Sequence, residues 1–229
     1  MALKYNVDYR NIAKIGNKEI KFKPWTTKNE KEYLIAVESE EKVTDDMLFD
    51  ILAKPCLEDP SIILSSNEQK MLMIEMRKKS LGNSFPMTFT CRKCNNVNDI
   101  DVEFDNIVSF EPESWTEVEV EDLKFVFGDI PSENLKNKLK ETENKVEKSF
   151  IDFLIHIKEI HIDGKVEDVF TFEELKDFID DIPSYIFDEA FKEFNKMKGH
   201  LEFKLATTCM ACGASNNIDF EYLPNFLWT

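Results

Sequence analysis

Two CxxC motifs, set in nearly the same phrase, occur more than a hundred residues apart in this 229-residue chain. The first phrase, FTCRKCNNVNDIDVEF, begins at Phe89, and the second, TTCMACGASNNIDFEY, begins at Thr207. Aligned from Thr90 and Thr208, they agree at seven of fifteen positions, where two unrelated windows would share roughly one. The agreeing pairs are Thr90/Thr208, Cys91/Cys209, Cys94/Cys212, Asn98/Asn216, Ile100/Ile218, Asp101/Asp219 and Glu103/Glu221. We interpret the phrase as an internal repeat that builds two equivalent halves of one site.

Each CxxC turn places two thiolates on one side of a tight loop, and two facing turns supply four sulfurs at tetrahedral geometry. We therefore predict a metal site formed by Cys91, Cys94, Cys209 and Cys212. Zinc is the favoured ion and iron the alternative, because soft thiolates bind both. Four sulfurs leave no position for water, so the predicted zinc is structural rather than catalytic. A thioredoxin-like redox role fits poorly, because it needs no second copy of the motif.

The strand-turn-strand pattern around each motif predicts a zinc ribbon whose two knuckles are separated by 114 residues. Gly213 follows the second knuckle and suits the left-handed backbone common there, and Asn95 in the equivalent place tolerates it next best. The predicted fold class is α+β, with helical segments around this discontinuous four-cysteine zinc ribbon and a long acidic, mostly helical insert between the knuckles. We expect three regions: an N-terminal strand and helix region (1–83), the zinc-ribbon domain (84–127 with 200–229) and the acidic helical insert (128–199).

Periodicity and capping signals place the individual elements. Residues 17–25 predict a strand or hairpin, and the alternating segment 116–128 predicts strands that pair with those of a knuckle. Asp163 and Gly164 predict a tight hairpin turn, and Thr171 with Glu174 predicts a capping box. Helices are expected from about 27 onward and over 44–54, 65–80, 132–157, 172–182 and 184–198.

The formal charge of −16 lies between the two CxxC motifs. The segment 95–208 holds 29 acidic and 13 basic residues, whereas the rest of the chain holds 16 of each. Such a surface repels nucleic-acid phosphates and anionic lipid and favours protein partners with basic patches, the alternative being a merely solvated acidic face. We expect no membrane span, because no run of about eighteen apolar residues occurs, and no secretory signal at the N-terminus. Five cysteines, four of them in CxxC pairs, indicate a reducing compartment such as the cytoplasm.

The remaining residues with reactive side chains are expected to be structural. Cys56 has no partner motif, so we interpret it as a small buried apolar residue. His156, His161 and His200 lie in apolar or strand-like settings, and we expect them in the core or at strand edges rather than as metal ligands. No HExxH, P-loop, GxSxG or dinucleotide-binding motif occurs. The sequence therefore predicts no enzyme.

Several stretches together resemble a known family. These are PWTTKNEKEYLIA near the N-terminus, the Arg-x-x-Ser-x-Gly passage (Arg77, Ser80, Gly82) leading into Cys91 and Cys94, the second knuckle, and the aromatic tail YLPNFLWT. The chain resembles the baseplate hub assembly family of T-even-like contractile-tailed bacteriophages, over most of its length. The resemblance implies a structural or chaperone-like role in building the tail hub, other hub or tail proteins as partners, and no catalytic residues. It implies a location in the virion tail baseplate or in the host cytoplasm during assembly.

Zinc ribbons also occur in nucleic-acid and transcription-type binding modules, which is the alternative function. Such a ribbon needs basic side chains to neutralise phosphates, but the strands after the knuckles read DIDVEF and NIDFEY, with only Arg92 and Lys93 basic nearby. We therefore favour the tail protein and expect no nucleic-acid binding. The helix 184–198 has a broad apolar stripe, and the tail adds aromatic residues between 222 and 228. Both either fold onto the protein's own core or, with the acidic insert steering encounter, form a docking surface.

Overall fold

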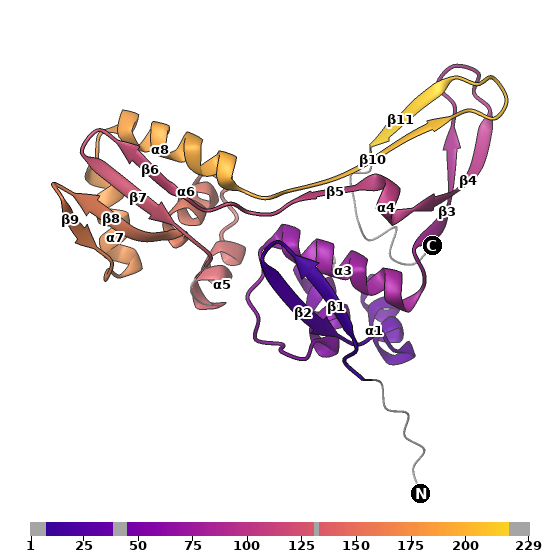
Figure 1. Ribbon diagram of the computed structural model, residues 1–229, viewed down its shortest axis with the longest axis horizontal. Helices are drawn as coiled ribbons and strands as arrows, with labels where there is room; N and C mark the ends of the chain where they lie inside the picture. Colours follow the sequence, from indigo (N-terminus) through magenta and orange to yellow (C-terminus); the bar gives the residue numbers. More distant parts are fainter. Residues whose placement is uncertain (1–7, 39–44, 131–132, 220–229) are drawn as a thin grey trace, which may run out of the picture. The chain divides into compact units, whose positions relative to one another are not determined.

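A computed structural model describes most of the chain, namely residues 8–38, 45–130 and 133–219 (Figure 1). The chain divides into two compact units. Unit 1 comprises Met1–Pro112 with His200–Thr229, and unit 2 comprises Glu113–Gly199. Unit 2 thus includes residues 113–127, upstream of the position 128 at which the acidic insert was expected to begin.

Unit 1 begins with a hairpin that carries one face of its core. Strands β1 (Asn11–Ile15) and β2 (Lys18–Phe22) pair antiparallel. Alternate side chains of the two strands are buried, as the strand period of two requires. The core that they join also contains residues from the helices and from the later strands, including Leu72, Met73, Phe85 and Phe104.

Ahead of the first CxxC hairpin, the described part of unit 1 contains the helices α1 (Thr27–Glu38), α2 (Asp45–Leu48) and α3 (Ser66–Ser80). The single helix expected from Thr44 to Pro55 is wrong in form. Only α2 is α-helical, and the chain continues as a π-helical turn η1 (Phe49–Ala53) and a 3-10 turn η2 (Lys54–Cys56). Pro55 cannot donate the backbone hydrogen bond that would extend an α-helix, so the tighter turn accommodates it. The expected cap Thr44 lies outside the described residues.

The Arg-x-x-Ser-x-Gly passage lies where the chain leaves α3 and enters the next strand, Ser84–Thr90. The buried Arg77 guanidinium donates hydrogen bonds to the carbonyls of Gly82 (2.6 Å) and Ser84 (3.4 Å). The Ser80 hydroxyl accepts a hydrogen bond from the backbone N–H of Trp25 (2.9 Å). Gly82 has a φ of +104°, a value that side chains disfavour. The passage therefore sets the direction in which the strand Ser84–Thr90 leaves the helix.

Two β-hairpins from distant parts of the chain carry the CxxC motifs. Strands β3 (Ser84–Thr90) and β4 (Val97–Glu103) form the first, and β10 (His200–Thr208) and β11 (Ser215–Asp219) form the second. After β4 the chain makes a short helix α4 (Phe104–Ile107) and a strand β5 (Val108–Glu111), which pairs with the start of β10. The three-stranded order β11-β10-β5 therefore ties the second hairpin to the chain that follows the first.

Unit 2 is an antiparallel sheet with helices packed on it. The strand order is β6-β7-β8-β9, from Glu117–Val120, Leu123–Phe127, Ile157–Ile162 and Lys165–Glu167. The helices are α5 (Glu133–Glu141), α6 (Lys145–Ile155), α7 (Phe172–Asp181) and α8 (Ser184–Met197). The core is dominated by aliphatic and phenylalanine side chains, with Phe153 completely buried and its ring 5.2 to 6.0 Å from those of Phe125, Phe127, Phe187, Phe191 and Phe194.

Two expectations for this region are wrong. The strands of 116–128 pair with each other and with β8, not with the knuckle strands, because their buried residues Val118, Phe125 and Phe127 complete the core of unit 2. The single helix expected over 132–157 is two helices, α5 and α6. Asn144 interrupts it, since its side chain accepts hydrogen bonds from the backbone N–H groups of Val146 and Glu147 and so caps a new helix.

Two local predictions are confirmed. Asp163 and Gly164 join β8 to β9 with φ values of 50° and 77°, as a tight primed turn requires. Thr171 and Glu174 form the expected capping box at the start of α7.

The predicted apolar stripe of the last helix lies in the core of unit 2, where Ile186, Ala190 and Phe194 are buried and Phe187, Phe191 and Met197 pack against them. This stripe is therefore covered by the unit's own sheet and helices.

Candidate metal centre

The two knuckles are the turns of the hairpins β3–β4 and β10–β11 (Figure 1), and their cysteines lie together. The first knuckle, 91–96, joins β3 to β4, and the second, 209–214, joins β10 to β11. The sulfurs of Cys91 and Cys212 are 3.8 Å apart, and those of Cys94 and Cys209 are 3.6 Å apart. All four sulfurs lie within 4.8 Å of one another. The structure thus brings together the four cysteines singled out in the sequence.

The spacing of these sulfurs fits a tetrahedral metal ion. Four sulfurs at about 2.3 Å from a central zinc are separated from one another by about 3.8 Å. The separations between the Cys94 and Cys209 sulfurs, 3.6 Å, and between the Cys91 and Cys212 sulfurs, 3.8 Å, are close to that value. Within each knuckle one cysteine is buried (Cys91, Cys209) and the other exposed (Cys94, Cys212). The four cysteines could therefore hold one metal ion near the protein surface.

The backbones of the two knuckles repeat the same hydrogen bonds. In the first, Cys91 N–H donates to the carbonyl of Asn96 and Asn95 N–H donates to that of Cys91, both at 2.9 Å. In the second, Cys209 N–H donates to the carbonyl of Ala214 and Gly213 N–H to that of Cys209, again at 2.9 Å. The predicted left-handed residues are confirmed, since φ is 57° at Asn95 and 68° at Gly213.

Two asparagines connect the knuckles, and the sequence interpretation gave them no role. Asn98 and Asn216 are buried, with 3% and 5% of their surface exposed. The Asn98 side-chain oxygen accepts a hydrogen bond from Met210 N–H (2.9 Å) in the second knuckle. The Asn216 oxygen accepts one from Arg92 N–H (3.2 Å) in the first. The sequence did contain a sign of this role, because asparagine occurs at the equivalent position in both copies of the repeat. Metal coordination by the cysteines does not explain why this polar residue is repeated.

The surroundings of the sulfurs shift the pKa values of Cys91 and Cys94 in opposite directions. The backbone N–H groups of Cys94 and Lys93 donate to the Cys91 sulfur and lower the pKa of that thiol to about 6. The backbone N–H of Asn96 favours the thiolate of Cys94. The hydrogen bond between Cys94 and Cys212 and the desolvation of the Cys94 sulfur outweigh this and raise the pKa of Cys94 to about 12. A metal ion binds thiolates, so binding at this centre releases protons.

The other candidate side chains are held in structural contacts. Burial raises the pKa of the Cys56 thiol to about 11, and its sulfur lies 3.6 Å from the Asn29 side-chain oxygen. His156 is buried in unit 2, with Nδ1 2.8 Å from the carbonyl of Gly128. His161 and His200 lie on strands β8 and β10, each beside a glutamate two residues away. None of these residues joins the cysteine cluster among the described residues.

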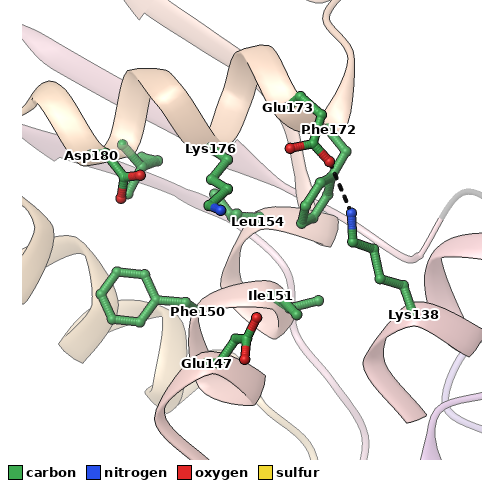
Figure 2. A pocket seen from close by; sticks show the side chains of 10 residues that line it. Lys138, Glu147, Phe150, Ile151, Leu154, Phe172, Glu173, Lys176 and Asp180 are labelled. Atoms are coloured by element: carbon green, nitrogen blue, oxygen red, sulfur yellow. Dashed lines mark hydrogen bonds and ion pairs between the residues drawn. The ribbon is translucent and has the colours of Figure 1, made fainter. Parts of the chain in front are cut away.

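Unit 2 contains a hollow of about 400 Å³ between α5, α6 and α7 (Figure 2). Phe150, Ile151 and Leu154 of α6 form apolar lining that faces α7. At one end, Lys138 of α5 lies 3.1 Å from a Glu173 carboxylate oxygen and 3.6 Å from the centre of the Phe172 ring. The lining offers apolar surface and charges of both signs, without a cluster of metal-ligating groups.

A model of the T4 bacteriophage base plate protein family matches residues 5–228, nearly the whole chain. The chain belongs to this family. The base plate family places it among the structural proteins of a phage tail baseplate. Among curated proteins and among solved structures, no match to this base plate protein was found. No helix within the described ranges is both long enough and apolar enough to cross a membrane.

Proposed function

We propose that this base plate protein is a non-enzymatic, structural or chaperone-like component in the assembly of the baseplate hub. In this proposal it binds other hub or tail proteins and carries one structural zinc on Cys91, Cys94, Cys209 and Cys212. It acts in the virion tail baseplate or in the host cytoplasm during assembly. The observation that carries the proposal is the convergence of four thiol sulfurs within 4.8 Å in a chain of the base plate family.

The donor set supports a structural zinc. Four thiolates complete a tetrahedral shell and leave no open position at which a substrate or water could bind. The ion would join hairpins from two distant parts of the chain and so fix both ends of the intervening segment. We propose that this segment contains the acidic insert, 128–199, which falls within unit 2. Unit 2 holds 23 acidic and 12 basic residues.

Elemental analysis and assembly tests address the two parts of this proposal separately. Purified protein should contain one zinc per chain, and its melting temperature should fall after chelation. Co-expression with the other tail proteins of the same phage should yield a complex that survives gel filtration. If the purified protein contains no metal and its melting is unchanged after chelation, the zinc proposal is wrong. If no complex forms with any tail protein, the proposed hub role is wrong.

The alternative function, a nucleic-acid-binding ribbon, is disfavoured by the charge of β4. Asp99, Asp101 and Glu103 are exposed on that strand, where they would repel phosphates. We expect no binding of a random DNA or RNA oligonucleotide at physiological salt. Sub-micromolar, salt-sensitive binding would favour the alternative instead.

We further propose that the aromatic tail, 222–228, docks on another hub component while the acidic insert steers the encounter. The tail lies outside the described residues, and the proposal rests on its sequence, which places five large apolar residues among the last eight. Deletion of 224–229 tests it. Unchanged melting with loss of co-purification supports docking. A melting temperature several degrees lower shows that the tail belongs to the core, and intact binding with intact stability excludes docking.

A further inference from the structure

The two buried asparagines are arranged as a reciprocal pair across the knuckles. Each uses its side-chain N–H to bind within its own hairpin, where Asn98 donates to the carbonyl of Asn96 and Asn216 to that of Ala214, both at 2.9 Å. Each uses its side-chain oxygen to accept from the opposite knuckle, at Met210 and Arg92. The repeat therefore matches not only the cysteines but also a crossed pair of hydrogen bonds.

The position of the accepted N–H groups makes this pair relevant to the metal. Arg92 and Met210 each follow the first cysteine of a CxxC turn, so the hydrogen bonds hold the backbone between the two ligands of each knuckle. Asn216 also places its side-chain nitrogen 3.7 Å from the Cys91 sulfur. An asparagine supplies an acceptor and donors on one short, rigid amide. An apolar residue in its place would leave buried N–H and carbonyl groups unpaired.

We propose that Asn98 and Asn216 are positioning residues that hold the two knuckles face to face and so bring the four sulfurs together before a metal binds. This inference rests on the proposed metal function for its consequence, but its geometry does not require the ion. The chain segment between Asn98 and Met210 is long. The pairing of β5 with β10 brings the two hairpins near each other, and the two asparagine hydrogen bonds act closer to the ligands, between the knuckles themselves. Residues that orient metal ligands in this way typically change metal affinity by about 10 to 100-fold when removed.

Metal affinity provides the first test. We expect Asn98→Ala and Asn216→Ala each to lower the affinity for Zn²⁺, measured in competition with a chromogenic chelator, by about 10 to 100-fold. Asn217→Ala is the matched control, because this neighbour is exposed, and its effect should stay within about twofold. Co²⁺ loaded into each variant should keep the absorption of a four-thiolate site. Affinities of both asparagine variants within about twofold of the parent protein overturn the proposal.

Hydrogen exchange in metal-free full-length protein provides the second test, with a crossed outcome. Asn98→Ala should speed exchange at the Met210 amide in the other knuckle, and Asn216→Ala should speed it at the Arg92 amide. Asn98→Asp retains an accepting oxygen, so it should keep the Met210 amide protected even if Asn98→Ala fails to fold. Faster exchange only in the mutated residue's own hairpin contradicts the proposal. If the parent protein binds no metal, the proposed metal function is wrong. Exchange at the Met210 and Arg92 amides in the opposite knuckle still tests the positioning role of Asn98 and Asn216.

Discussion

The knuckle end of the two cysteine hairpins and the interior of unit 2 bury different kinds of side chains. In the segments 90–98 and 208–217, the buried residues are two cysteines and two asparagines, Cys91, Cys209, Asn98 and Asn216. In unit 2, most buried residues are apolar, and Phe125, Phe153 and Phe194 are completely covered, although His156 and Lys136 are buried as well. Unit 2 therefore has a core that the hydrophobic effect stabilises. The knuckle end lacks such a core and depends on hydrogen bonds and, in our proposal, on a metal ion.

The largest expected effect comes from removing one sulfur. We expect Cys212→Ser to abolish metal binding and unfold the knuckle end, because structural zinc contributes on the order of 10 kcal/mol in small ribbons. Unit 2 should stay folded. Two-dimensional NMR would check this, with loss of dispersed signals from β3, β4, β10 and β11 and retention of those from β6 to β9. Equal loss in both units would show that the two regions fold as one, contrary to the comparison.

Truncating a core phenylalanine should produce the opposite pattern. Phe153 is completely buried among five other rings, and Phe→Ala in such a site costs about 3 to 5 kcal/mol. We expect Phe153→Ala to destabilise unit 2 in denaturant while Zn²⁺ affinity at the knuckles stays unchanged. Val169→Ala is a control in the same unit, because Val169 is 89% exposed. A parallel loss of zinc affinity in Phe153→Ala would break the comparison.

A pH titration should distinguish the regions further. Burial lowers the pKa of His156 below its ordinary value of about 6.5. The unfolded chain therefore binds the proton more readily, so the stability of unit 2 is full above pH 6.5 and falls as the pH drops below it. One such group changes the free energy of unfolding by at most about 1.4 kcal/mol per pH unit.

The matched variant for this titration is His156→Gln. Glutamine cannot take up the proton, so the slope of unit 2 stability between pH 6.5 and 5 should flatten. Urea melts monitored by Trp115 fluorescence would report it, because the Trp115 ring lies 4.2 Å from that of His156. An unchanged slope in the variant would assign the pH dependence to other groups.

The parts of the structure that could be predicted from sequence are those fixed by local chemistry. The capping box at Thr171 and the turn at Asp163 and Gly164 depend on a few adjacent residues, and both predictions are confirmed. The repeat likewise located the four cysteines that the structure brings together, and their role as zinc ligands stays a prediction. The alternation in 116–128 identified strands but not the strand with which they pair. Periodicity shows which face of a strand is buried, but it does not show which strand lies beside it.

The role of the asparagines depended on information that local pattern does not contain. Asn98 and Asn216 accept hydrogen bonds from the opposite hairpin, and only the facing of the two hairpins determines which N–H groups they reach. Asn144 was missed for a different reason. Its flanking helical signals are strong on both sides, and only its side-chain bonds to Val146 and Glu147 divide α5 from α6.

The smallest expected effect compares the two knuckles with each other. Gly213 and Asn95 occupy equivalent places with left-handed φ values of 68° and 57°. A side-chain carbon at Gly213 would meet no atom within 4 Å, so any cost of substitution there arises from the backbone conformation and not from a clash. Alanine in this conformation costs about 1 to 2 kcal/mol, whereas asparagine tolerates it better. We therefore expect Gly213→Ala to lower the thermal stability of unit 1 and Gly213→Asn, which copies the first knuckle, to lower it less. Equal losses of thermal stability would mean that asparagine has no advantage over alanine at position 213. The two knuckles would then share their hydrogen bonds but not their backbone energetics.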